Sequence, residues 1–311
     1  MLAIIAPGQG SQTPGMLNSW VADPELKNLL LTWSDAIGLD LLSLGTTADA
    51  DEIKDTANAQ PLIVATSLLG SHALGIENCA VTSGHSVGEL AAAALSGAIN
   101  ESDALKLVRA RGVEMAKAAS AQPAGMSAVL GGERAEVLAA ISQMNLVAAN
   151  DNGAGQIVAA GDLNALAKLG ENPPAGARVR ALAVAGAFHT SFMAPAVEPL
   201  RKLASTVVTN PVLIQVISNK DGQVVNDGAE VLNRIVNQIA NPVRWDLCME
   251  TLKSLGVTGV IELPPAGTLV GLLKRAAPEI ETFALKSAED LSAAQEFAGR
   301  HAATPSTLVT T

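Results

Sequence analysis

The chain has 311 residues, of which 49% are hydrophobic and 16% charged. This composition excludes an intrinsically disordered protein and leaves room for two units with buried cores. The 30 acidic residues outnumber the 20 basic ones, for a net charge of -10, so we expect no nucleic-acid or membrane partner. Cys79 and Cys248 stand apart, without the spacing of a zinc site or disulfide framework. We therefore expect no metal and a reducing, cytoplasmic location.

The N-terminal part alternates strand and helix patterns. Met1–Pro7 is a buried strand pattern, too short for a signal peptide or a membrane span. Asp23 and Pro24 open a helix that Gly38 ends. Further elements are expected at 60–74 (helix), 79–82 (strand), 87–95 (helix) and 101–119 (helix). Strand, sharp turn and helix in this order predict an α/β fold with a parallel sheet.

The middle of the chain changes to a β-α-β-β-α-β pattern, typical of a ferredoxin-like unit. Its strands are expected at 126–130, 146–149, 156–160 and 179–184, and its helices at 133–141 and 163–169. The larger sheet then resumes with strands at 212–218 and 257–263 and helices at 230–240 and 245–255. We thus predict a catalytic domain of residues 1–120 and 186–299, an insertion at 121–185 and a flexible tail at 300–311.

The segment Gly84–Gly88 matches G-x-S-x-G, the pattern of a strained turn between strand and helix that exposes a serine. Ser86 is then a candidate nucleophile. The helix that follows directs its free N–H groups at the serine, so the Val87 N–H can stabilise an oxyanion there. The alternative is a turn with a purely structural role.

A serine nucleophile needs a base, and the chain has only four histidines. We expect His72 to be a satisfied core histidine, His301 to be solvated in the tail, and His85 to pack or hydrogen-bond locally. His189 follows the last strand of the insertion and remains as the base, against the alternative of a structural loop histidine.

No acidic residue completes a hydrolase triad convincingly. The carboxylates between Ser86 and His189 lie in a helix or inside the insertion; they include Asp103, Glu114, Asp151 and Asp162. A Ser-His pair oriented by a main-chain carbonyl is the simpler hypothesis.

Arg111 lies on the apolar stripe of the helix that Asn100 caps, together with Ala104, Leu107, Val108 and Met115. A guanidinium on a core-facing stripe is costly unless it meets an anion. It either forms an internal salt bridge, extends to solvent, or binds a substrate carboxylate close to Ser86.

Several motifs in the right order resemble the malonyl-CoA:acyl carrier protein transacylases and the acyltransferase domains of modular synthases. The matching segments are Pro7–Gln12, Gly84–Glu89, Arg111–Gly112, Asn152–Gln156, Ala187–His189, Ser218–Asn219 and Asn241–Trp245. The resemblance implies an α/β-hydrolase-like, parallel-sheet domain with an inserted ferredoxin-like subdomain.

The same resemblance assigns roles to individual residues. Ser86 would accept the acyl group and His189 would be its base, oriented by the main-chain carbonyl of Gln238. The backbone N–H groups of Gln9 and Val87 would form the oxyanion hole. Arg111 would bind the malonyl carboxylate, in a substrate site that also holds Phe188, His85, Met115 and Asn152.

Phe188 precedes the base, where synthase domains carry Phe for malonyl and Ser for methylmalonyl substrates. The resemblance therefore implies selectivity for malonyl by exclusion of one methyl group. Two departures are Gly186, where those domains often carry His, and Leu263–Gly267, which replaces a Gly-Pro-Gly loop.

We thus expect a cofactor-free, monomeric transacylase that passes malonyl from malonyl-CoA to the phosphopantetheine thiol of an acyl carrier protein. The alternatives are a serine hydrolase or editing thioesterase on the same elbow, and a non-catalytic malonyl-CoA-binding module. Since carrier proteins are acidic, four basic residues are docking candidates, against the alternative of solvated surface charge. They are Arg178, Arg180, Lys274 and Arg275.

Overall fold

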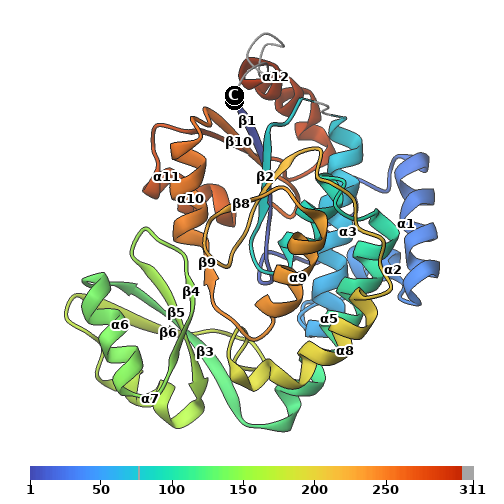
Figure 1. The fold of residues 1–311 in the computed structure, drawn as a ribbon. Helices are drawn as coiled ribbons and strands as arrows, with labels where there is room; N and C mark the ends of the chain where they lie inside the picture. The colour runs from blue at the N-terminus through green and yellow to red at the C-terminus, as the bar shows by residue number, and fades with distance from the viewer. Residues whose placement is uncertain (76–77, 303–311) are drawn as a thin grey trace.

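Two β-sheets organise the computed structural model, which describes residues 1–75 and 78–302 (Figure 1). The larger sheet has the order β11-β10-β1-β2-β7-β8, and every neighbouring pair is parallel except β7 and β8. Its strands are β1 (Leu2–Ala6), β2 (Val81–Gly84), β7 (Gln215–Ile217), β8 (Val224–Val225), β10 (Gly259–Glu262) and β11 (Glu281–Ala284). The mixed α/β class with a parallel sheet is confirmed.

Helices cover both faces of this sheet, which explains why the central strand β1 is apolar at every position. In β1, Leu2 and Ile4 belong to one hydrophobic cluster, whereas Ala3 and Ile5 belong to another. The first cluster includes residues of α1 (Pro24–Ile37), α2 (Leu41–Thr46), α3 (Thr56–Leu74), α4 (Gly88–Leu95), α5 (Glu101–Ala121), α8 (Ala194–Ala204), α9 (Gly228–Gln238) and α12 (Leu291–His301). The second includes residues of α10 (Trp245–Ser254) and α11 (Thr268–Ala276).

The second sheet has the order β6-β3-β5-β4-β9. It contains β3 (Ala124–Gly131), β4 (Val147–Asp151), β5 (Gln156–Asp162), β6 (Ala177–Ala181) and β9 (Val243–Arg244). The first four strands pair antiparallel in the ferredoxin-like order, and α6 (Arg134–Gln143) and α7 (Leu163–Glu171) share a hydrophobic cluster with one face. Strand β9 joins parallel to β4 from outside residues 121–185, so this interval does not hold the entire sheet.

Capping side chains set several helix boundaries as expected. Asp23 accepts a hydrogen bond from the Glu25 N–H at the start of α1, and Gly38 ends that helix in the left-handed conformation. Asn100 caps α5 in the same way. Helix α3 begins four residues earlier than predicted because Asp55 caps it.

Strand edges and the C-terminal region differ most from the sequence expectation. Strand β6 ends at Ala181 and does not reach 184, and β7 is limited to three residues. Helices α2, α8, α11 and α12 and strands β8, β9 and β11 were not predicted. Two short 3₁₀ helices, η1 (Ser191–Met193) and η2 (Ala288–Asp290), complete the described elements.

The predicted tail is wrong at its start, because α12 continues through Arg300 to His301. His301 is buried, hydrogen-bonds the Thr258 hydroxyl and packs on the Phe297 ring. A Cβ on Gly259 would lie 2.3 Å from the His301 ring, so this glycine makes room for it. Residues 303–311 lie outside the described part of the chain. In that described part, no helix is both long and apolar enough to cross a bilayer.

Candidate active site

The turn between β2 and α4 carries Ser86 in a strained conformation, with φ at 53°. A Cβ on Gly84 would lie 2.0 Å from the Gly88 carbonyl group, and a Cβ on Gly88 would lie 2.4 Å from the Ala6 carbonyl oxygen. Both flanking positions of the motif therefore need glycine for steric reasons. The tight turn leaves the serine side chain in the pocket.

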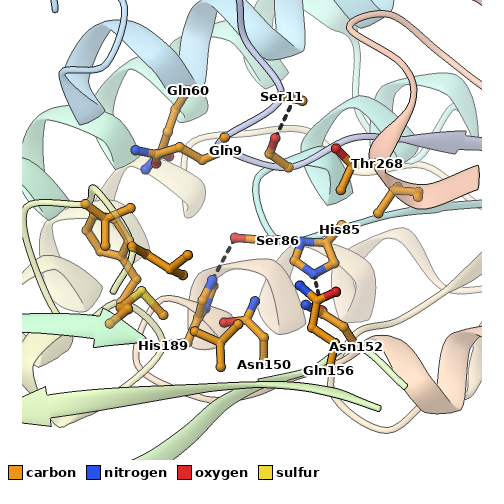
Figure 2. A pocket seen from close by; sticks show the side chains of 18 of the residues that line it. Gln9, Ser11, Gln60, His85, Ser86, Asn150, Asn152, Gln156, His189 and Thr268 are labelled. Atoms are coloured by element: carbon orange, nitrogen blue, oxygen red, sulfur yellow. Dashed lines mark hydrogen bonds between the residues drawn. The ribbon is translucent and has the colours of Figure 1, made fainter. Parts of the chain in front are cut away.

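Ser86 and His189 point toward one another in the pocket (Figure 2). Ser86 Oγ lies 2.7 Å from His189 Nε2, and His189 Nδ1 lies 2.8 Å from the main-chain oxygen of Gln238. A carbonyl oxygen can only accept a hydrogen bond, so Nδ1 must carry the proton and Nε2 is free to accept one from Ser86. His189 also has a positive φ, 60°.

The four carboxylates weighed as a third triad member have other partners. Asp103 accepts from Asn100, Glu114 pairs with Lys117, and Asp151 pairs with Arg134. Asp162 caps α7. The contact to Nδ1 is therefore made by a neutral carbonyl.

Burial keeps His189 neutral. It lowers the pKa of His189 to about 3, and the nearby positive charge of Arg111 acts in the same direction. At neutral pH the imidazole is therefore unprotonated and available as a proton acceptor.

Several parts of the chain meet around Ser86 to form the pocket. The loop after β1 contributes Gln9, and α5 contributes Arg111 and Met115. The second sheet contributes a wall opposite this loop, including Asn150 and Gln156, which Figure 2 shows below Ser86. Other lining residues are Gly8, Gly10, Ser11, Gln60, His85, Met126, Asn152, Val158, Leu182, Val184, Phe188, His189, Thr268, Leu269 and Leu272.

The N–H groups of Gln9 and Val87 are unpartnered: neither donates to an acceptor in residues 1–75 and 78–302. Val87 immediately precedes α4, whose N-terminal end carries partial positive charge. Its side chain is buried away from the pocket, so only its main chain can act there. The two N–H groups are thus free to bind a negatively charged oxygen.

Arg111 is buried, with 1% of its surface exposed, and no carboxylate in the described residues lies within salt-bridge distance of it. Its Nη1 donates to Gln60 Oε1 at 2.5 Å. Its Nη2 donates to Gln238 Oε1 at 3.0 Å and contacts Ser86 Oγ at 3.4 Å. Burial lowers the pKa of Arg111 to about 10, so the group stays charged at neutral pH. A buried cation beside the nucleophile, held only by neutral oxygens, is suited to an anionic substrate.

The alternative internal salt bridge of Arg111 is therefore wrong. Gly112, the next residue, allows the placement of Arg111, because a Cβ there would lie 2.9 Å from the Thr56 carbonyl oxygen at the start of α3. The two helices meet closely at this point and direct the guanidinium into the site.

His72 and His301 have the opposite environments to those expected for them. His72, expected in the core, is 42% exposed and pairs with Glu101, whereas His301 is buried. His85 packs and hydrogen-bonds as predicted, but with partners distant in sequence: its Nε2 lies 2.8 Å from Asn152 Oδ1, and its ring packs edge-on against Trp245. Burial lowers the pKa of His85.

The two departures from the resembled family have local structural consequences. A Cβ on Gly186 would lie 2.6 Å from the Ala119 Cβ, so α5 occupies the space of a side chain there. In the Leu263–Gly267 region, the buried carboxylate of Glu262 accepts hydrogen bonds from the N–H groups of Gly267, Leu269 and Val270. This carboxylate caps α11 and holds the loop against the pocket.

Sequence reasoning missed the polar network behind the site. Glu89 and Asn219 are buried there, and the Ser86 N–H donates to Asn219 Oδ1 at 2.7 Å. Burial raises the pKa of Glu89 to about 8, against the lowering effects of the Asn219 N–H and Arg111. Glu89 follows the elbow directly and Asn219 follows a predicted strand, so a polar residue at each of these positions was the available signal.

The four basic residues considered for docking are all exposed. Arg178 and Arg180 lie on the edge strand β6, opposite Leu130 and Ala128 of β3. Strand alternation places them on the same face of the sheet as Met126, which lines the pocket. Lys274 and Arg275 lie in the last turn of α11.

Comparisons with known proteins find one acyl transferase family and relatives that are named malonyl CoA-acyl carrier protein transacylases. The acyl transferase domain family matches residues 4–300. The malonyl CoA-acyl carrier protein transacylase of Mycobacterium bovis is 51% identical over 297 residues, covering 94% of this chain and 98% of that protein. That of Salmonella typhimurium is 32% identical over 302 residues, covering 94% and 98%.

Solved structures are similar over the same extent. The crystal structure of MCAT from Mycobacterium tuberculosis aligns with a TM-score of 0.92 at 50% identity, covering 95% of this chain and 99% of that one. A malonyl-transacylase in complex with a type II PKS acyl-carrier protein aligns with a TM-score of 0.90 at 29% identity, again covering 95% and 99%.

Proposed function

Because the chain belongs to the acyl transferase family, we propose that Ser86 and His189 carry out its reaction through a malonyl-serine intermediate. The reaction is that of a malonyl-CoA:acyl carrier protein transacylase, in which malonyl passes from CoA to the phosphopantetheine thiol of the carrier. The observation that carries the assignment to these residues is the buried, carboxylate-free Arg111 at 3.4 Å from Ser86 Oγ.

In the first half-reaction, His189 Nε2 takes the proton of Ser86 Oγ as Oγ attacks the thioester carbonyl carbon. The oxyanion that forms accepts hydrogen bonds from the Gln9 and Val87 N–H groups. The carbon–sulfur bond then breaks, and the CoA sulfur leaves with the proton from His189. Malonyl remains esterified to Ser86, with its free carboxylate on Arg111.

The second half-reaction runs the same steps with a different thiol. His189 accepts the proton of the carrier thiol, whose sulfur attacks the ester carbonyl. The carbon–oxygen bond breaks and Ser86 Oγ regains its proton from His189. The hydrolase alternative needs water in place of this thiol and a triad carboxylate beside His189 Nδ1. The main-chain carbonyl of Gln238 occupies that position instead, which favours transfer.

Arg111 supplies a test of the carboxylate site. Arg111→Ala is expected to lower kcat/KM for malonyl-CoA by about 30-fold or more, because a buried charge partner is typically worth about 2 to 5 kcal/mol. Acylation by acetyl-CoA, which has no carboxylate, should fall much less. Single-turnover acylation of Ser86 by each thioester measures both effects.

The same variant has a second expected signature in its pH profile. His189 acts when neutral, and the charge of Arg111 helps lower its pKa, so removal of that charge should move the acid limb of acylation to higher pH. Arg111→Lys, which keeps the charge, is the matched control and should keep the limb in place. An unchanged malonyl preference in Arg111→Ala would contradict the assignment.

Phe188 supplies a test of acyl-chain selectivity. Its ring is 6% exposed and lines the pocket next to His189. Phe188→Ser is expected to raise the ratio of methylmalonyl to malonyl transfer by about 10-fold or more, since exclusion of one methyl group is worth about 1 to 3 kcal/mol. Competition between the two thioesters in one reaction measures the ratio, and no change would remove Phe188 as the selectivity residue.

The remaining expectations belong to the same proposal. We propose that residues 1–120 and 186–299 act as the catalytic domain and 121–185 as an insertion that delivers His189 to Ser86. Because one chain supplies every residue of the site, we propose a monomer. Two free cysteines support a reducing, cytoplasmic location. The surplus of acidic residues argues against nucleic acid as a partner.

A further inference from the structure

Glu89 lies in the first turn of α4 and is 2% exposed, yet it forms no salt bridge in the part of the chain that the structure describes. Its Oε1 accepts the Asn219 backbone N–H at 2.6 Å, and its Oε2 accepts a hydrogen bond from Gln238 Nε2. Both oxygens accept from N–H donors, and these contacts stabilise the ionised carboxylate against the burial that raises its pKa. A buried charge of this kind is costly and has no part in the reaction steps above.

The contacts of Glu89 fix which way the Gln238 amide faces. The Gln238 NH₂ group also donates to Asn219 Oδ1 at 3.1 Å. Asn219 is itself oriented, because its Nδ2 donates to the Gly84 carbonyl oxygen at 2.8 Å. With two acceptors on the NH₂ side, Gln238 must turn its Oε1 toward Arg111, where it accepts from Nη2.

Gln238 therefore connects the carboxylate behind the site to both functional groups in front of it. Its side chain holds Arg111, and its main-chain oxygen holds His189. We propose that Glu89 is a positioning residue that keeps the Gln238 amide oxygen on Arg111, and so maintains the preference of the site for acyl groups that carry a carboxylate. The proposal rests on the proposed function, because it concerns selectivity at the same site.

Replacement of Glu89 by glutamine isolates this role. A glutamine has one acceptor oxygen, whereas the Asn219 N–H and the Gln238 NH₂ group both require an acceptor. The backbone N–H of Asn219 cannot move, so it donates to the single amide oxygen of the new glutamine. The NH₂ group of that glutamine then faces the NH₂ group of Gln238, and two donors meet. Gln238 must then turn over and present its NH₂ group to Arg111, which loses an acceptor and moves out of place.

The test compares the rates at which malonyl-CoA and acetyl-CoA acylate Ser86 in single-turnover reactions of the full chain. Glu89→Gln is expected to lower the malonyl-to-acetyl ratio at least tenfold. Gln238→Ala, which keeps the main-chain oxygen on His189, should lower it similarly, and the double variant should lower it no further. Glu136→Gln, at an exposed position on α6, is the matched control and should leave the ratio unchanged.

The outcomes separate the possible failures. If Glu89 has a merely structural role, its replacement should lower the acylation rates with malonyl-CoA and acetyl-CoA equally, or the malonyl-to-acetyl ratio of the double variant should fall by the product of the two single effects. Either result overturns the proposal. If Glu89→Gln does not fold, the Gln238→Ala variant alone decides. An unchanged malonyl-to-acetyl ratio in that variant would show that the Gln238 side chain does not maintain the preference, and would overturn the proposal. If the unmodified chain forms no malonyl-enzyme, the proposed function fails instead.

Discussion

Ser86→Ala is expected to lower malonyl transfer by at least about 10⁴-fold, the largest effect of any single substitution in the chain. Ser86 Oγ is the one atom of this chain that bonds covalently to malonyl in the proposed mechanism. The alanine fits the turn sterically no worse than serine, since both have a Cβ at the positive φ of this position. Folding should therefore be retained, and thermal unfolding of the variant checks this.

Ser205→Ala is the matched control for this prediction. Ser205 is exposed at the end of α8, and its hydroxyl only donates to the Lys202 carbonyl oxygen. Its transfer rate should equal that of the unmodified chain. Substantial transfer by a folded Ser86→Ala variant would rule out the covalent route.

His189→Ala is expected to have the second largest effect, a loss of about 10²- to 10⁴-fold in the acylation rate, which is the usual contribution of a general base. The rate that remains should no longer show an ionisation assigned to His189. Stopped-flow release of CoA over a range of pH measures both the rate and the profile. His72→Ala, whose histidine pairs with Glu101 at the surface, is the control and should be as fast as the unmodified chain.

The pH profile of the unmodified chain follows from the environment of His189. Its pKa is lowered to about 3, so the neutral base persists well below pH 6.5 and the acid limb should lie below the ordinary histidine range. A carboxylate bound to Arg111 would offset the charge that helps lower this pKa, and would strengthen the base when malonyl is present. An acid limb at or above pH 6.5 would contradict this account of the site.

Local sequence patterns were sufficient for the elements that carry Ser86 and Arg111. Gly84 of the elbow and the cap at Asn100 act within a few residues, so their effect does not depend on the rest of the fold. Gly88 is different, because the close approach of Ala6 in β1 is what requires a glycine there. Elimination among four histidines identified the one that meets Ser86 because composition left few alternatives. The placement of Arg111 on an apolar stripe indicated a buried cation, which the structure contains.

Features that depend on contacts distant in sequence could not be predicted in this way. His301 is buried because α12 packs beside β10, at a glycine more than forty residues earlier in the chain. Strand β9 has two residues and no alternating pattern of its own, and it exists because β4 lies beside it. In the sequence, Glu89 has the pattern of an ordinary acidic residue in the first turn of a helix. It becomes part of the site only through its tertiary contacts with Asn219 and Gln238.

Intact-mass analysis of the chain mixed with malonyl-CoA tests the central claim most directly. We expect a malonyl adduct that peptide mapping places on Ser86 and that persists in the absence of a thiol acceptor. When an acyl carrier protein with its phosphopantetheine arm is added, the adduct should disappear as malonyl appears on that carrier. An adduct on another residue, or steady release of CoA with no adduct and no need for a carrier, would contradict it.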